Sequence, residues 1–94
     1  MKTRIYTMRD AAVQGFERPV MFRTDAEAIR AVDQTLKTGN SHLNQSPADY
    51  SLWYVGEFDG ETGEIKPVSP ECVLTSQSMV NMAEIVERNG NDGE

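Results

Sequence analysis

The sequence predicts a small α+β protein with a short antiparallel sheet and one helix packed on a face, from three observations. The chain has 94 residues, which is enough for one domain. Extended and helical segments follow in the order β-β-α-β-β, and a last amphipathic segment predicts a C-terminal helix. We therefore expect one α+β domain over residues 1–75, a helix over 76–88 and a disordered acidic tail over 89–94.

Two short strands open the predicted sheet. Residues 2–9 favour extended structure, and strand alternation divides them into two faces. Ile5 and Thr7 lie on one face, and the other face carries Arg4, Tyr6 and Met8. Residues 10–18 read as a loop, and residues 19–23 predict a second strand in which Val20 and Phe22 share a face.

The helix over residues 25–38 carries the strongest local signals in the chain. Thr24 and Glu27 form a capping box at its start, and Gly39 stands where a helix ends. Apolar residues recur at helical spacing and make one stripe: Ala28, Ile29, Val32 and Leu36. This stripe predicts the side that packs on the sheet.

A second pair of strands follows a polar loop over residues 40–45. Ser46 and Pro47 begin a single helical turn, and residues 50–58 form a strand that is apolar on both faces. On this strand Leu52, Tyr54 and Phe58 alternate with Trp53 and Val55. A hairpin loop over 59–63 leads to a returning strand over 64–68, which Pro67 and Pro70 are expected to interrupt.

The charge distribution limits the kinds of partner. The net charge is −6, but residues 1–47 carry +2 and residues 48–94 carry −8. An acidic chain is not a general nucleic-acid binder, so any DNA contact needs a local basic patch. The chain has no run of 18 apolar residues, so no membrane partner is expected.

Residues for enzyme chemistry are scarce. His42 is the only histidine and Cys72 the only cysteine, which together cannot complete a zinc site. No phosphate-binding loop and no nucleophile-elbow motif occurs in the sequence. The sequence thus predicts no enzyme activity, no cofactor and no metal.

The sheet face turned away from the helix is the candidate site. If Ile5, Val20, Phe22, Leu52 and Tyr54 face the helix, arginines and large side chains gather on the other side: Arg4, Tyr6, Met8, Met21, Arg23, Trp53 and Val55. Aromatic rings beside arginines stack on bases and bind phosphates. The same residue types are enriched at oligomer interfaces, and a second core layer under the C-terminal helix is a third interpretation.

Four stretches of the sequence together carry a family resemblance: residues 2–10, 18–30, 46–59 and 61–65. In pattern and order they resemble the small non-structural DNA-binding protein of gokushoviruses, single-stranded DNA phages of the microvirus family. The resemblance covers about residues 2–70. It implies a phage protein of the host bacterial cytoplasm that has no enzyme activity and takes part in viral DNA replication and packaging.

Two hypotheses follow from the residues and the resemblance together. In the first, the protein binds DNA, expected to be single-stranded, and assists viral DNA replication and packaging. The expected DNA-binding residues are Lys2, Arg4, Tyr6, Arg9, Arg23 and Trp53. In the second, the protein is an oligomeric adaptor of the replication or procapsid complex without DNA contact. Both expect a homo-oligomer, since a strand that is apolar on both faces needs cover.

Overall fold

The computed structural model describes residues 1–92, with side chains described through Asn89. Its elements are β1 (Lys2–Asp10), β2 (Gly15–Phe16), β3 (Val20–Phe22), α1 (Asp25–Thr38), α2 (His42–Gln45), a 3-10 turn η1 (Pro47–Asp49), β4 (Tyr50–Asp59), β5 (Ile65–Leu74) and α3 (Ser76–Asp92). The predicted α+β class with an antiparallel sheet is confirmed, and α1 has the predicted bounds.

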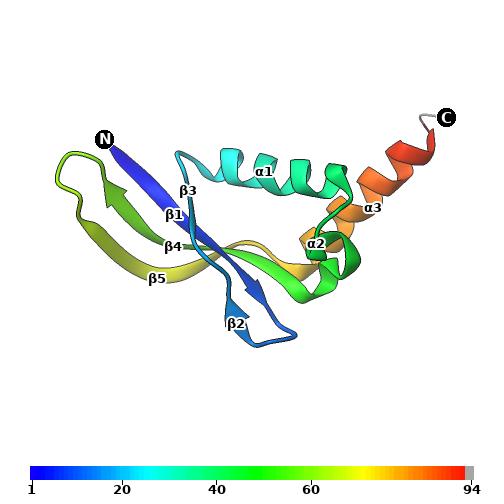
Figure 1. The fold of residues 1–94 in the computed structure, drawn as a ribbon, viewed down its shortest axis with the longest axis horizontal. Coiled ribbons are helices and arrows are strands. Elements are labelled where there is room, and N and C mark those ends of the chain that lie inside the picture. Colours follow the sequence, from blue (N-terminus) through cyan, green and yellow to red (C-terminus); the bar gives the residue numbers. More distant parts are fainter. Residues whose placement is uncertain (93–94) are drawn as a thin grey trace.

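The sheet has the strand order β2-β1-β4-β5, and β3 pairs with β1 on the same edge as β2 (Figure 1). All pairings are antiparallel. The central pair is β1 with β4, which runs from Lys2 opposite Asp59 to Asp10 opposite Tyr50. Gly56 is required where β4 meets β5, because a Cβ there would lie 2.9 Å from the carbonyl oxygen of Lys66.

The alternation of β1 defines two faces of the sheet. Residues paired across strands share a face, so Tyr6 and Tyr54 lie on one face while Thr7 and Trp53 lie on the other. We call the first the covered face, because its side chains pack with the helices. We call the second the open face; its paired positions include Ile5, Met21, Thr7, Trp53, Arg9 and Phe16.

One core joins the covered face to both long helices. Val32 and Leu36 of α1 and Met79 of α3 are buried in the same cluster as Tyr6 and Leu52. The C-terminal helix therefore packs beside α1, on the same side of the sheet. Trp53 is not part of this core cluster and lies on the opposite face of the sheet, whereas Tyr6 and Met8 pack in the cluster together with Met79 of α3.

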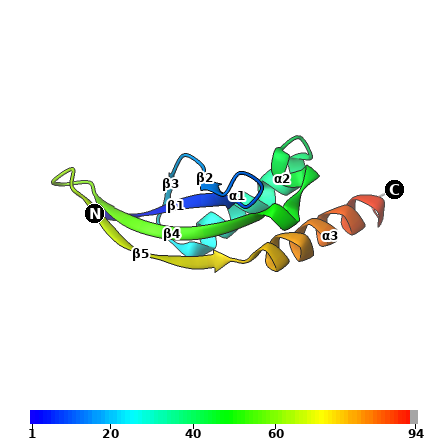
Figure 2. The same cartoon turned by 90° about the horizontal axis from the view of Figure 1, so that it is seen from below.

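The molecule is elongated, with extents of 50 × 28 × 18 Å. The β4–β5 hairpin and the start of β1 project beyond α1 at one end, and α3 projects at the other end (Figure 1). Figure 2 shows β5 along one edge of the sheet, running directly into α3. No helix in residues 1–92 is long and apolar enough to cross a membrane.

The face expected for β1 is wrong. Ile5 was expected toward the helix and Tyr6 away from it, but Tyr6 is fully buried beside α1 and Ile5 lies on the open face. Arg4 and Tyr6 bind Asp25 at the start of α1, which fixes this orientation. A bulge in β4 near Val55 also reverses the alternation, so Phe58 lies on the face opposite to Tyr54.

Two predicted loops contain regular structure. The polar residues 40–45 include α2, where Ser41 and Asn44 form a capping box and Leu43 is buried in the core. The predicted loop over residues 10–18 contains β2, which is held against β1. The expected turn at residues 46–49 is confirmed as η1.

The C-terminal third departs from prediction in two places. β5 continues through Pro67 and Pro70, because it is the last strand of the sheet and its outer side has no ladder to interrupt. α3 continues to Asp92, so the tail expected from residue 89 is helical over 89–92. A helix nucleated by packing at Met79 extends at little further cost. Residues 93–94 lie outside the described part.

Candidate nucleic-acid interface

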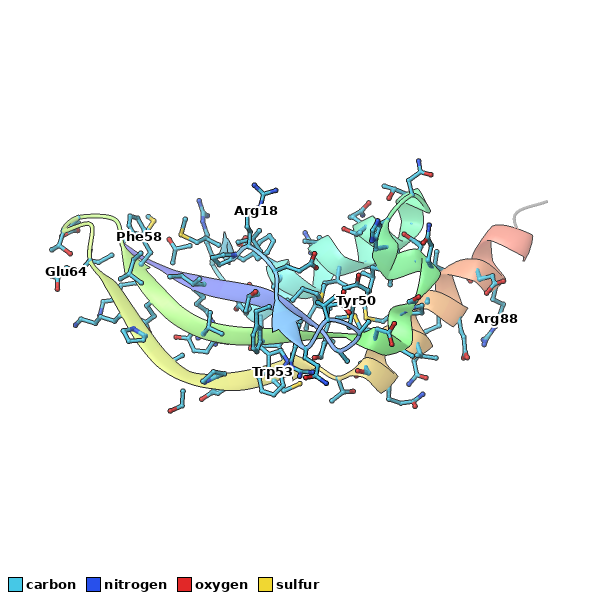
Figure 3. All side chains as sticks on the ribbon, turned by 60° about the horizontal axis from the view of Figure 1, so that its bottom comes forward. Arg18, Tyr50, Trp53, Phe58, Glu64 and Arg88 are labelled. Atoms are coloured by element: carbon cyan, nitrogen blue, oxygen red, sulfur yellow. The ribbon has the colours of Figure 1, made fainter. Side chains whose placement is uncertain are left out.

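An aromatic pair marks the open face. Phe16 and Trp53 meet edge to face, with ring centroids 6.4 Å apart and an interplanar angle of 81°. Phe16 comes from β2 and Trp53 from β4, so the pair lies across β1. Phe16 is 52% exposed, and the Trp53 indole N–H donates to Ser51 Oγ at 2.8 Å. Figure 3 shows Trp53 on the side of the sheet away from α1.

Arg9 lies in the same patch. It pairs with Phe16 on one side and with Ser51 on the other, so these three residues form one row across the open face. The next row holds Thr7 and Trp53. Arg9 is half-buried and takes no part in the ion pairs of the described residues. We call Arg9, Phe16, Ser51 and Trp53 the aromatic patch.

The sheet separates its charges by face. Four paired positions of the sheet hold carboxylates, and their cross-strand partners place all four on the covered face: Asp10, Glu57, Asp59 and Glu71. On the open face, Arg9 is the charged residue among the described paired positions. The acidic net charge of the chain therefore does not extend to the aromatic patch.

Two predicted binding residues instead hold the core together. The Arg4 guanidinium lies 3.7 Å from the ring centroid of Tyr54, and it also forms an ion pair with Asp25 at 3.2 Å. Arg4 Nε donates to the Tyr6 hydroxyl at 2.9 Å, and that hydroxyl donates to Asp25. This network joins β1 and β4 to the first turn of α1.

Burial of Tyr6 has an electrostatic consequence. Loss of solvation, together with the hydrogen bond to Asp25, raises the pKa of Tyr6 to about 12. The phenol therefore stays protonated and keeps its donor to Asp25 throughout the neutral range. With no exposed surface, Tyr6 has no ring face to offer a base.

The remaining predicted residues lie apart from one another. Arg23 is exposed directly after β3, next to the open-face residue Met21. Lys2 is exposed at the start of β1, where its cross-strand neighbour is the carboxylate Asp59. Of the six predicted residues, the structure brings Arg9 and Trp53 together and places Arg23 farther along the same edge.

Sequence reasoning missed Phe16. This residue stands in a strand of two residues, which is too short to show a period. The available signal was composition, since a large aromatic residue in an otherwise small and polar loop is unusual. Among the described residues, no group of three or more His, Cys, Asp or Glu residues is placed to hold a metal ion.

The curled sheet, covered by helices on one face and carrying an aromatic patch on the other, defines a small α+β domain. Over residues 3–84 the chain matches the family described as Phage ORF5 protein, and it belongs to that bacteriophage family. No curated protein and no solved structure matches the chain.

Proposed function

We propose that this phage protein binds single-stranded DNA through the open face and assists viral DNA replication and packaging in the host cytoplasm. The family is a bacteriophage family, and the resemblance to the gokushovirus non-structural protein supports the finer assignment. The observation that carries the proposal is the aromatic patch. In it Phe16 pairs with Arg9 and Trp53 stands in the next row, and the paired positions of this face hold no carboxylate among the described residues.

The patch fits the chemistry of a flexible single strand. Unstacked bases pack on aromatic rings, and arginines bind the phosphates between them. Arg9 stands within the patch and Arg23 near the other end of the same edge, so a strand following β1 would pass both. The acidic hairpin and α3 lie at the two ends of the long axis, away from this path.

A salt titration tests the proposal. We expect a labelled single-stranded oligonucleotide to bind at about 50 mM salt, with an affinity that falls linearly on a double-logarithmic plot. Arg9→Ala should flatten the slope by about 0.7 and weaken binding about fivefold near 100 mM salt. Arg88→Ala removes the same charge from exposed α3 and is the matched control.

Two results of the salt titration would contradict the proposal. Equal slopes for wild type and Arg9→Ala would remove the aromatic patch from any DNA contact. Absence of binding at about 50 mM salt would reject DNA binding altogether, because electrostatic attraction is strong there.

A second candidate function is an oligomeric adaptor of the replication or procapsid complex. The observation that favours it is apolar exposure on the same sheet edge, where Met21 is 53% and Val20 50% exposed. Such surfaces are typical of protein contacts. Light scattering at tens of micromolar, with Trp53→Lys as the variant, distinguishes the two: an adaptor gives a dimer or larger that the variant dissociates, without DNA binding.

A further inference from the structure

A groove on the covered side of the sheet is separate from the aromatic patch. It has a volume of about 840 Å³ and lies between α1, α2 and the segment that joins β2 to β3. Met8, Leu43 and Leu52 contribute to its apolar lining, and Ala31 of α1 leaves space because its side chain is small. A cavity of this size accommodates several side chains of a bound segment.

One end of the groove is negatively charged. Tyr50 lines this end, Asp10 is its cross-strand neighbour and Asp49 precedes it in the chain. Glu17 lines the groove directly. These three carboxylates take no part in the ion pairs of the described residues, whereas the opposing positive charge on the lining is Arg18.

The buried side chain of Tyr50 lies close enough to these carboxylates for them to affect its pKa. Burial, followed by the nearby carboxylates Asp10 and Glu17, raises the pKa of Tyr50. Its hydroxyl therefore remains neutral and polar beside the carboxylates. A cation entering here would meet acceptor oxygens at the end of an apolar channel.

We propose that this groove binds a segment of a partner protein in which a bulky apolar side chain stands next to a lysine or arginine. The apolar side chain would fill the space over Leu52 and Met8, and the basic group would lie against Glu17 and Asp10. The same carboxylates repel a phosphate backbone, which excludes nucleic acid as the occupant.

A second copy of the chain is a poorer fit for the groove. Exposed apolar–basic pairs among the described residues include Met1 with Lys2, which lie beside Glu61 and Asp59, and Ile65 with Lys66 on the projecting hairpin. Glu64 precedes the second pair directly, and Glu61 and Asp59 stand in the same hairpin. A hairpin with these acids would be repelled by the carboxylate end, so the complementary charge must come from another protein.

The test is a selection from a random peptide library against the full chain, with the groove filled in a variant. Ala31→Trp places an indole in the groove from a half-buried helix position. We expect enriched peptides that carry an apolar residue beside Lys or Arg and that bind the Ala31→Trp variant at least about tenfold more weakly. Thermal melting checks that the variant is folded.

A charge reversal provides the second measurement and does not depend on filling the groove. Glu17→Lys should weaken the selected peptides about fivefold, and Glu64→Lys, the same change on the exposed hairpin, less than about twofold. Peptides without a basic residue, equal binding to both reversals, or no enrichment would overturn the proposal. A mass that falls from dimer to monomer in Ala31→Trp would also overturn it, in favour of a second copy.

Discussion

The two faces of the sheet use the same residue types in opposite ways. On the covered face, Arg4 stacks on Tyr54 and binds Asp25, and Tyr6 is buried beneath them. On the open face, Arg9 stands beside Phe16 without an ion partner among the described residues. Arg4 and its aromatic neighbours thus stabilise the fold on the covered face, whereas Arg9 and its aromatic neighbours can bind a ligand on the open face.

The difference is decided by one acidic residue far away in sequence. Asp25 lies in the first turn of α1, where the helix dipole favours a carboxylate, and it faces Arg4 and Tyr6. In the part of the chain that the structure describes, no carboxylate occupies a paired position on the open face. The function of an arginine–aromatic cluster therefore depends on whether the fold supplies its counterion.

The largest expected effect concerns the covered face. Val32→Asp would bury a charge without a partner in the core between α1 and the sheet, and should lower the free energy of unfolding by roughly 3 kcal/mol or more. Gln34→Asp adds the same charge on the exposed side of α1 and should change it by less than about 0.5 kcal/mol. Urea unfolding of both variants checks this; coincident curves would show that Val32 does not face the core.

The next effect is a loss of stability at high pH. The pKa of Tyr6 is raised to about 12 in the folded state against about 10 in the unfolded chain. Its contribution is complete below pH of about 10 and is lost as the pH rises through about 12, by up to roughly 2–3 kcal/mol. Tyr6→Phe should be less stable at neutral pH but should lose less between these limits. Parallel losses in the two proteins would contradict a buried, hydrogen-bonded Tyr6.

A smaller effect tests the open face. Trp53→Leu should weaken single-stranded DNA binding about tenfold, because one stacking platform is removed. Phe58→Leu is the control, since Phe58 lies on the open face at the hairpin end, away from Arg9. Fluorescence anisotropy measures both affinities. If the two variants bind DNA equally well, the aromatic patch contributes no more to DNA binding than the hairpin end of the open face.

The smallest effect concerns the acidic C-terminus. Removing residues 89–94 deletes the carboxylates of Asp92 and Glu94 and should strengthen DNA binding less than about twofold at about 50 mM salt. The gain should vanish at higher salt, because screening shortens the reach of these charges. The full-length chain with Asp92→Asn and Glu94→Gln should reproduce it. A gain that persists at high salt would point to direct obstruction rather than repulsion.

The parts of the fold that were predictable depend on local signals. Thr24, the apolar stripe and Gly39 mark the start, the buried side and the end of α1, and Gly39 has the left-handed φ of 75° that the helix end requires. The covered side of β1 was not predictable, because alternation identifies two faces but not which one meets a helix. Leu43 gave too weak a signal for α2, being a single apolar residue among polar ones.

The candidate site was predictable only where its residues do not depend on distant partners. Trp53 and Arg9 were both expected among the DNA-binding residues, but the expected open face contained Trp53 without Arg9. It contained instead Arg4 and Tyr6, which lie on the covered face. Phe16 joined Trp53 and Arg9 through a strand of two residues that exists only because β1 offers an edge. The wrong face for Arg4 and Tyr6 thus came from their contacts with Asp25 in α1, and the missing Phe16 from a short local pairing with β1. Alternation within a single strand reveals neither.

The pairing of β1 with β4 has a consequence for how the chain is made. Lys2 pairs with Asp59, so β1 leaves the ribosome before β4, the partner that α1 separates from it in the chain. At about 5–20 residues per second this interval lasts several seconds, during which β1 would expose a bare edge. β3 and β2 pair with β1 from nearby sequence and shield one side of it in the meantime. We therefore expect the N-terminal segment to form a local three-stranded intermediate during translation, which the arrival of β4 completes.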